Sequence, residues 1–386
     1  MTPSTDQLPS NSDNVIQAAD EFAQRHLVPN AAQWGRGLFD RKALFEPAGD
    51  AGLLGLQVPL AWGGMALPFT DTARVLHKLA QIDFSAAMAL VNSHNVAAQL
   101  AKASPHALAP LYAGNLMRGL TVACTALTEP GAGSDLGQIQ TTAIRQGDGW
   151  LLNGEKTWVI NAAHADAVVV YAQTQTGSGV KGIAAFWVLA DSPGFERVAV
   201  TTHTALSSMG IGGFRLRNVY CDASHLVYAP GEAFVDIMAA INRARTYVAA
   251  MCCGMVFRAL HDVRVYGHKR AAFGQPLEQF QGWRWQVAQA ATALQAAELM
   301  VREACDRIDR GLDVQSAAAQ AKLYATSVAQ TQLGILLHAM GAEGFLDHYA
   351  FLRHLTAAHA ASLTDGSTAM LLERVSHDLR FKPDAG

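Results

Sequence analysis

The sequence predicts an α+β protein in three parts: an N-terminal all-α domain, a middle β-barrel-like domain and a C-terminal four-helix bundle. Two observations support this prediction. Apolar residues recur at helical spacing in the first and last thirds of the chain, whereas short β-rich runs broken by glycines fill the middle. The length of 386 residues allows two or three domains with sizeable cores. We place the domains at residues 1–120, 121–230 and 231–386.

The N-terminal part is expected to be a series of helices. Its first apolar stripe consists of Val15, Ala19, Phe22 and Leu27. Two strongly apolar helices follow, at roughly 70–82 and 84–102. His94 lies in the more apolar of these, and two interpretations are open: a hydrogen-bonded core histidine, or a residue that lines a substrate pocket.

The middle part contains runs typical of strands, such as Val168–Tyr171 and Ile183–Leu189. Phe214–Arg217 alternates apolar and charged residues, as a half-buried strand does. Gly147-Asp148-Gly149 is typical of a hairpin turn. After Gly231 the chain is amphipathic over long segments, about 233–268, 279–310 and 314–340, with short connections, which predicts an antiparallel bundle.

The composition argues against several classes of protein. A net charge of −3 argues against nucleic-acid binding, which needs clustered Lys and Arg. The five cysteines are odd in number and have no CxxC spacing, which predicts reduced, buried thiols and no metal site. The segment Met1–Asn14 lacks the features of a targeting peptide, and the longest apolar run, Tyr247–Phe257, is too short to span a bilayer. We therefore expect a cytoplasmic protein without a membrane segment.

One stretch, Ala126–Asp135, stands out where the texture of the sequence changes from helical to β-type. We call it the central loop. Pro130 fixes φ and removes a donor, and Gly131 and Gly133 after it allow a ligand to approach the main chain. Ser134 and Asp135 then offer polar contacts. By composition alone, the central loop would be a Gly-rich turn between domains.

Four motifs in order resemble those of the acyl-CoA dehydrogenases, a family of FAD flavoproteins. They are Thr128–Asp135, Leu152–Trp158, Arg270–Leu277 and Asp365–Thr368. The resemblance covers nearly the whole chain and implies the α–β–α fold of that family. It also implies FAD as cofactor, an acyl-CoA or acyl carrier protein thioester as substrate, and an electron-transfer flavoprotein or oxygen as electron acceptor.

The resemblance implies which residues contact FAD. Thr128 and the main chain around Leu127 would hydrogen-bond the pyrimidine side of the flavin, where donors stabilise the charge of the reduced ring. Trp158, which otherwise suggests core packing, would lie against the isoalloxazine ring. The full set expected at the cofactor is Ala126, Leu127, Thr128, Gly133, Ser134, Trp158, Ile160, Arg270, Phe273, Leu277, Gln281, His338, Gly341, Ala342, Ser367 and Ala369.

The motif at Arg270–Leu277 and the residue Gln281 are expected in the loop between two long helices. Unaided, this pattern suggests a solvated turn. The resemblance implies instead that the loop reaches the FAD of a neighbouring subunit, with Arg270 on the pyrophosphate, for which a planar bidentate donor is suited. The segment expected to meet it is His338–Phe345. The protein would then be an obligate homo-oligomer, a dimer or a tetramer.

Asp365 is the position with the greatest consequence for chemistry. Alone, the motif around it would suggest a turn and a helix N-cap. The resemblance aligns Asp365 with the usual glutamate base, which removes the α-proton of the thioester while hydride passes from the β-carbon to the flavin. Such a base needs a dry pocket that raises its pKa. An aspartate is shorter by about 1.5 Å, and a misplacement of ~1 Å can cost on the order of 100-fold in rate.

Two further observations qualify the predicted activity. Some members carry the base on the helix at the place of Ala244, so Asp365 is the candidate base in this chain. Ile160 stands where a hydroxyl usually faces flavin N5, which predicts an altered flavin potential or oxygen reactivity. The residues expected at the substrate are Ser134, Asn242, Arg245, Thr364, Gly366 and His94.

The leading hypothesis is therefore an FAD-dependent α,β-dehydrogenase of acyl thioesters with Asp365 as base. Nitroalkane oxidases of the same superfamily use an aspartate base, so a flavin oxidase of that kind is the second hypothesis. A degenerate, non-catalytic relative is the third, and thioester eliminations such as desulfination stay open. The acyl chain is not revealed by the sequence.

Overall fold

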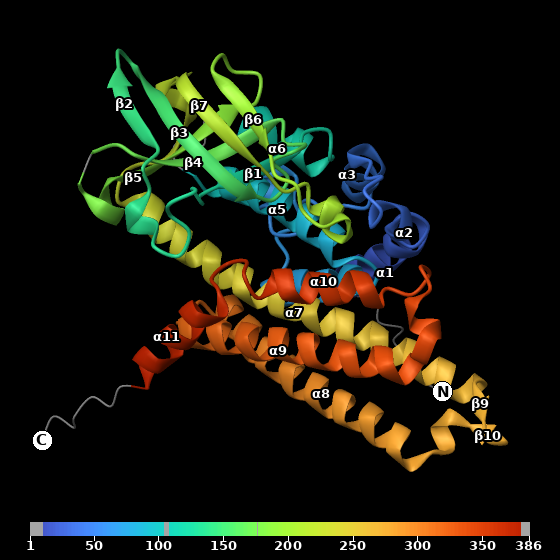
Figure 1. Ribbon diagram of the computed structural model, residues 1–386. Helices are drawn as coiled ribbons and strands as arrows, with labels where there is room; N and C mark the ends of the chain where they lie inside the picture. Colours follow the sequence, from blue (N-terminus) through green and yellow to red (C-terminus); the bar gives the residue numbers. More distant parts are fainter. Residues whose placement is uncertain (1–10, 104–107, 176, 380–386) are drawn as a thin grey trace, which may run out of the picture.

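The computed structural model describes residues 11–103, 108–175 and 177–379. Most of the Met1–Asn14 segment and the chain end after residue 379 lie outside these ranges. Helices come first, strands second and helices again third. Figure 1 shows the sheet domain above a layer of long helices, with the N-terminal helices packed beside both. The α+β architecture predicted from the sequence is confirmed.

The N-terminal domain contains six α-helices within the described ranges, of which α5 is the longest. They are α1 (Asn11–Phe22), α2 (Ala31–Trp34), α3 (Arg41–Asp50), α4 (Phe69–Ala80), α5 (Phe84–Lys102) and α6 (Ala109–Met117). The predicted stripe from Val15 to Leu27 is buried. Its last step, from Phe22 to Leu27, spans five residues, and a π-helical turn at Ala23–Leu27 brings Leu27 onto the same face.

Helix α5 begins with a side-chain cap. Asp83 precedes it in an extended conformation, and its carboxylate accepts a hydrogen bond of 3.0 Å from the N–H of Ala86. Most residues of α5 are buried, because the helix packs against the N-terminal helices, the sheet and the C-terminal helices.

The middle domain is one eight-stranded sheet. Its strands are β1 (Ala123–Ala126), β2 (Thr142–Gln146), β3 (Gly149–Val159), β4 (Ala167–Gln173), β5 (Ile183–Leu189), β6 (Phe195–Ala199), β7 (Gly212–Cys221) and β8 (Leu226–Tyr228). The order is β6-β7-β3-β2-β4-β5-β8, and β1 pairs in parallel with β4. Gln146 pairs with Gly149, which confirms the predicted hairpin turn. All seven residues of β4 are buried, as expected for a strand covered on both faces.

The C-terminal domain consists of long helices and a small hairpin. Its elements are α7 (Glu232–Lys269), β9 (Ala271–Ala272), β10 (Gln275–Pro276), α8 (Gln281–Asp309), α9 (Gln315–Met340), α10 (Phe351–Ala361) and α11 (Thr368–Asp378). With 38 residues, α7 is roughly 57 Å long at 1.5 Å per residue. It runs between the sheet domain and the lower helices across the whole molecule (Figure 1).

The core joins the domains instead of separating them. The largest buried cluster takes residues from α1, α4 and α5 and also from α7, α8 and α9. A second cluster joins α5 and α6 to β4 and β5, and a third lies inside the sheet. All five cysteines are buried and free, as predicted. No helix in the described part of the chain has the length and apolar character needed to cross a bilayer.

Candidate functional site

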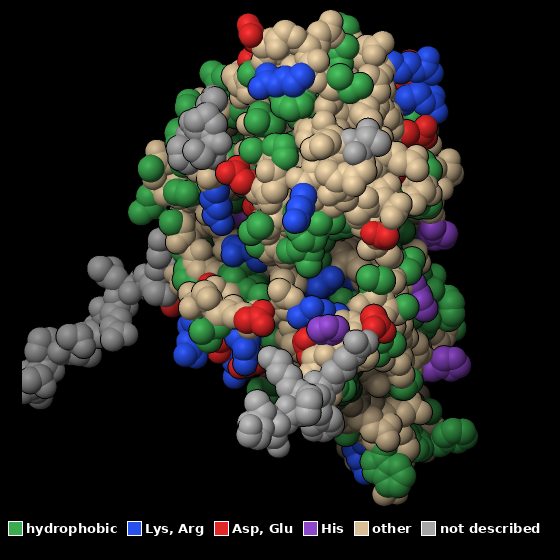
Figure 2. Space-filling view, turned by 90° about the vertical axis from the view of Figure 1, so that its left-hand side faces the viewer, with side chains coloured by type: hydrophobic (Ala, Val, Ile, Leu, Met, Phe, Trp, Pro, Cys, Tyr) green, Lys and Arg blue, Asp and Glu red, His purple; other side chains and the backbone are tan. Residues whose placement is uncertain are grey.

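One side of the molecule is hollowed. In Figure 2 the hollow lies at the height of α7, between the sheet domain above and the C-terminal helices below, and Lys and Arg side chains gather around it. The central loop belongs to the sheet domain, and the loop that carries Asp365, between α10 and α11, belongs to the C-terminal helices.

A buried ion pair fixes the start of the central loop. The Lys156 ammonium group donates to Glu129 Oε1 at 2.8 Å and to the Leu127 carbonyl at 3.0 Å. Glu129 also accepts hydrogen bonds from the N–H groups of Gln140 and Thr141, at 2.6 and 2.9 Å. Burial lowers the pKa of Lys156 to about 8, although the charge of Glu129 opposes the shift. These contacts hold the backbone of the central loop before its glycines.

Trp158 lies beside the central loop at the end of β3. The neighbouring Thr157 N–H donates to the Thr128 carbonyl at 3.0 Å. Trp158 has a left-handed backbone with φ of 56° and is 62% exposed, which is unusual for the largest aromatic side chain. A Cβ placed on Gly131 would meet no atom within 4 Å, and one on Gly133 would meet only Thr128 Cγ2, at 3.9 Å. The central loop therefore presents an open, aromatic-lined surface.

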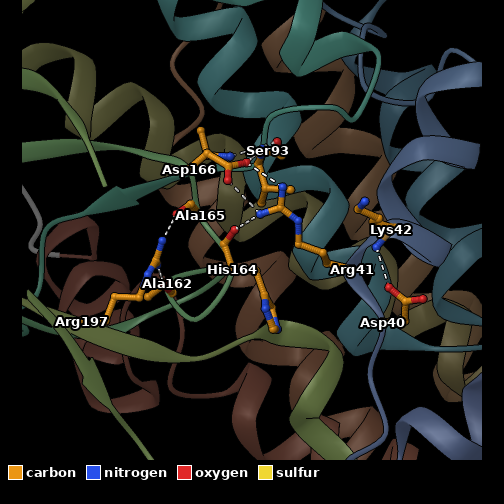
Figure 3. A network of polar contacts seen from close by, with 11 residues as sticks. Asp40, Arg41, Lys42, Ser93, Ala162, His164, Ala165, Asp166 and Arg197 are labelled. Atoms are coloured by element: carbon orange, nitrogen blue, oxygen red, sulfur yellow. Dashed lines mark hydrogen bonds and ion pairs between the residues drawn. The ribbon is translucent and has the colours of Figure 1, made fainter. Parts of the chain in front are cut away.

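A polar network fixes the strands that carry this surface. Figure 3 shows Arg41 of α3 pointing between the His164 carbonyl and the Asp166 carboxylate. The guanidinium of Arg41 binds both carboxylate oxygens of Asp166, at 3.0 and 2.8 Å. Asp166 also accepts a 2.9 Å hydrogen bond from Val122, which precedes β1. The network therefore ties the N-terminal domain to the strand that leads into the central loop.

Asn161 anchors the other strand, and the sequence analysis missed it. Its amide donates to the Ala89 carbonyl of α5 at 2.8 Å, and its N–H donates to the Met209 carbonyl at 2.7 Å. It is 1% exposed and has a φ of 66°. Asn tolerates this region better than most residues, so an Asn directly after the Trp158–Ile160 stretch was the available signal. Ile160 itself is half-buried and packs against the largest core cluster.

Asp365 lies in the loop between α10 and α11, with a φ of 53°. Two cations hold the three consecutive carbonyls of this loop. The Lys322 ammonium group donates to the carbonyls of Thr364 and Gly366, the latter at 2.6 Å. Arg245 Nε donates to the Asp365 carbonyl at 3.0 Å. The predicted residues Arg245, Thr364, Asp365 and Gly366 are therefore brought together by the structure.

Arg245 is also joined to a second predicted residue, Asn242, whose side-chain oxygen accepts from Nη1 at 3.1 Å. Burial raises the pKa of Asp365, while the charges of Lys322 and Arg245 act in the opposite direction. Tyr247 of α7 is close enough for the charge of Asp365 to add to the effect of burial in raising its pKa. The carboxyl is thus a base stronger than an ordinary aspartate.

Lys322 is the second residue that the sequence analysis missed. It lies in α9 and is 0% exposed. The signal was weak: a lysine on the buried side of an alanine-rich helix, between Ala321 and Ala325. Nothing in that local pattern indicates contact with a loop that follows α10.

His94 is a hydrogen-bonded core histidine. It is 2% exposed, and Nε2 accepts a 3.1 Å hydrogen bond from the Gln57 N–H. The other ring nitrogen lies 3.2 Å from Asn95 Oδ1. Burial lowers the pKa of His94 to about 4, so the ring is neutral at neutral pH. Asn95 in turn donates to the Tyr247 hydroxyl at 3.2 Å, which links His94 to the surroundings of Asp365.

Seven of the predicted cofactor residues lie at the far end of α7. Arg270 directly follows α7 and comes 25 residues after Arg245, which is roughly 38 Å along the helix. Gln281 is the first residue of α8 and not part of the loop, which corrects the expectation. This distant group consists of Arg270, Phe273, Leu277, Gln281, His338, Gly341 and Ala342. Within one chain it is not brought to Trp158 and Asp365.

Backbone strain coincides with the predicted site. In the described part of the chain, six non-glycine residues have positive φ. Three of them, Trp158, Phe273 and Asp365, were selected from the sequence for other reasons. Residues in this region cost of order 1–3 kcal/mol and cluster at functional sites. By contrast, no group of three or more His, Cys, Asp or Glu side chains within the described ranges could hold a metal ion.

The chain matches three domain families. Residues 10–119 match "Acyl-CoA dehydrogenase, N-terminal domain", residues 124–219 the "middle domain" and residues 233–379 the "C-terminal domain". It is 29% identical to the short-chain specific acyl-CoA dehydrogenase of human mitochondria over 368 residues, which cover 94% of this chain and 88% of the relative. It is 28% identical to an acyl-CoA dehydrogenase of Bacillus subtilis, covering 90% and 92%.

Solved structures agree with these matches. A structure described as the electron transferring flavoprotein of Acidaminococcus fermentans superposes with a TM-score of 0.92 at 27% identity, covering 97% of this chain and 100% of the other. A glutaryl-coenzyme A dehydrogenase in its glutaryl-CoA complex gives 0.90 at 26% identity, covering 96% and 95%. Because three domain families match nearly the whole chain in order, this protein belongs to the acyl-CoA dehydrogenase family.

Proposed function

We propose that this protein is an FAD-dependent enzyme that dehydrogenates an acyl thioester between its α- and β-carbons, with Asp365 as the base that removes the α-proton. The observation that carries the proposal is the placement of Asp365. Its side chain is half-buried, its pKa is raised, and it stands on a loop whose three carbonyls are held by Lys322 and Arg245. A general base of this kind contributes about 10²–10⁴-fold to rate.

The central loop suits a flat cofactor such as FAD. Exposed Trp158 offers an aromatic face, and Gly131 and Gly133 leave open space beside the main chain. The carbonyls of Leu127 and Thr128 already accept hydrogen bonds from Lys156 and Thr157. We therefore assign contacts with the flavin to the Thr128 hydroxyl, the main-chain N–H groups and Ser134. FAD, when bound, supplies the acceptor for the hydride.

Asp365 acts by holding a proton at its carboxylate. Burial raises its affinity for the α-proton, and the nearby charges of Lys322 and Arg245 keep the carboxylate populated before reaction. Arg245 donates from Nε to the Asp365 carbonyl and from Nη1 to the side-chain oxygen of Asn242. We propose that Arg245 orients the base and that Asn242 and Thr364 contact the thioester side of the substrate.

We assign CoA as the carrier of the acyl group and an electron-transfer flavoprotein as the acceptor. Two similarities support this choice: the CoA complex of the glutaryl-coenzyme A dehydrogenase and the close superposition on the structure described as an electron transferring flavoprotein. An acyl carrier protein thioester and oxygen are the alternatives that an assay must separate.

We also propose a homo-oligomer in which the far end of α7 serves a neighbouring subunit. Phe273 at the tip of the β9–β10 hairpin is 98% exposed and has a φ of 48°. An open groove on α8 and α9 includes Trp285 and Tyr324 and is largely apolar. Exposed apolar surface of this kind marks contact with another chain. Arg270, next to the hairpin, would reach the cofactor of that chain.

The experiment is a substrate screen on purified protein. Bound FAD is quantified first, and a panel of acyl-CoA thioesters is then added without oxygen. We expect the flavin to bleach and the thioester to lose two hydrogens by mass. Protein that carries FAD and is bleached by no acyl thioester, on CoA or on carrier protein, would refute the proposal.

A nitroalkane oxidase activity is the second candidate. Asp365 in place of a glutamate and the apolar Ile160 favour it. Oxygen uptake with small primary nitroalkanes, dependent on Asp365, would support this candidate, and absence of uptake by FAD-loaded protein would exclude it.

A further inference from the structure

We propose that Lys322 is a positioning residue for the Asp365 base. Its buried ammonium group binds the two carbonyls that flank Asp365, and its positive charge stabilises the ionised carboxylate. This inference rests on the proposed role of Asp365 and adds a residue to that site. Lys322 acts through Asp365 and is not itself assigned a contact with substrate.

The geometry of the clamp is specific. Lys322 Nζ donates to the carbonyls of Thr364 and Gly366, one on each side of Asp365. These bonds use two of the three donors of the ammonium group. The peptide between them has Asp365 in the left-handed region, with Gly366 following at a φ of 103°. Such a conformation persists only where its surroundings impose it, and Lys322 holds both ends.

A neutral hydrogen-bond donor could support the loop with a smaller desolvation penalty, because a charged group loses its hydration when it is buried. Lys322 is 0% exposed, and its Thr326 neighbour is bonded only to α9 carbonyls. The reason for a charge is therefore to be found in what faces it. The groups that face Lys322 are Asp365 from the loop and Arg245 and Cys252 from α7.

The two groups influence each other. Burial lowers the pKa of Lys322 to about 8, and Asp365 is the nearby charge that opposes this shift most. Burial raises the pKa of Asp365, and Lys322 is the charge that opposes that shift most, ahead of Arg245. Tyr247 also faces Asp365, and its own pKa is raised far out of the physiological range. Of these groups, Lys322 is the cation that loses its proton closest to neutral pH.

Deprotonation of Lys322 should weaken the site at alkaline pH. As the pH rises past about 8, Lys322 becomes neutral. The clamp then loses its charge-assisted hydrogen bonds, which are about twice as strong as neutral ones, and the carboxylate loses its counter-charge. Catalysis that depends on Asp365 is therefore expected to fall on the alkaline side with the titration of Lys322.

The direct test titrates Asp365 without any substrate. Difference infrared spectroscopy on the FAD-loaded protein follows the protonated carboxyl band that Asp365→Asn removes. We expect Lys322→Met to raise the midpoint of this band by about one pH unit, the lower end of the effect of a nearby opposite charge. The matched control is Thr326→Val, one turn along the same buried face of α9, which should leave the midpoint unchanged. An unchanged midpoint in Lys322→Met would overturn the proposal.

A second variant keeps the charge and removes its titration. In Lys322→Arg the guanidinium stays protonated at every accessible pH, so the alkaline fall in kcat/KM near pH 8 should disappear. If kcat/KM of Lys322→Arg still falls near pH 8, the proposal is contradicted. This test stands even if Lys322→Met does not fold. The infrared arm needs no turnover, so failure of the proposed dehydrogenase activity is distinguishable from failure of this inference.

Discussion

The Nζ atom of Lys156 lies 2.8 Å from Oε1 of Glu129, and both side chains are buried beneath the central loop. The pair comes from two separate segments, the end of β3 and the loop after β1. Glu129 also accepts two backbone N–H groups, so its charge is fully compensated. The central loop is thus held by an internal ion pair that does not depend on a ligand.

Removing one partner should destabilise the fold. Lys156→Met leaves the Glu129 carboxylate buried without its counter-charge, which is expected to lower the free energy of unfolding by about 3–5 kcal/mol. Urea denaturation measures the change. Lys181→Met is the control, because Lys181 is exposed, and it should stay within about 0.5 kcal/mol. A Lys156→Met protein as stable as Lys181→Met would contradict this reading of the pair.

The same pair predicts a loss of stability in acid. Burial alone would raise the pKa of Glu129, but Lys156 and the hydrogen bonds lower it below its ordinary value of 4.5. The unfolded chain therefore takes up a proton at a higher pH than the folded one. The contribution of Glu129 is present above 4.5 and is lost as the pH falls through the folded pKa. Glu129→Gln should flatten this part of the stability curve, and an equally steep curve would argue against the assignment.

Trp158 should matter for the cofactor and not for the fold. Because its side chain is 62% exposed, Trp158→Ala is expected to change the unfolding free energy of the apoprotein by less than about 0.5 kcal/mol. The variant should nevertheless lose FAD during dialysis much faster than the wild type. Tyr220→Ala, which removes an aromatic side chain that is 52% exposed on β7, is the control and should keep its FAD. Equal FAD retention in both variants would remove Trp158 from the site.

The β9–β10 hairpin should control assembly. Phe273→Asp places a charge on a side chain that is 98% exposed, so the chain should still fold. If the hairpin meets another subunit, sedimentation velocity should show a smaller species, and FAD content should drop with it. Leu38→Asp, at an N-terminal residue that is 69% exposed, is expected to leave the assembly intact. A Phe273→Asp protein of unchanged size would contradict the proposed interface.

Much of the fold was predictable because the helices carry their own periodicity. The predicted helix at 84–102 matches α5, and the predicted strand at 183–189 matches β5. The type of the helical turn after Phe22 was not predictable from the sequence. A five-residue step between buried positions fits a π-helical turn, but such turns are rare enough that regular helix is the better guess from sequence.

The candidate site was predictable where a residue with a chemical role lies within a recognisable sequence motif, as Asp365 and Trp158 do. Asn161 and Lys322 were missed because their roles are tertiary. Asn161 reaches Ala89 of α5, and Lys322 reaches a loop that follows α10; neither contact leaves a local pattern. The positive φ values of Trp158 and Asp365 were likewise not predictable, because Trp rarely adopts the left-handed region and Asp does so far less readily than Gly.

The role of Asp365 is tested most directly by the rate at which an acyl-CoA reduces the bound flavin, without oxygen, in the wild type and in Asp365→Asn. If Asp365 is the base, the wild type bleaches and the variant, with FAD still bound, bleaches about 10²–10⁴-fold more slowly. Asp365→Glu, which keeps the carboxylate but moves it by about 1.5 Å, should fall between the two. An Asp365→Asn protein that bleaches at the wild-type rate would contradict the assignment of Asp365 as the base.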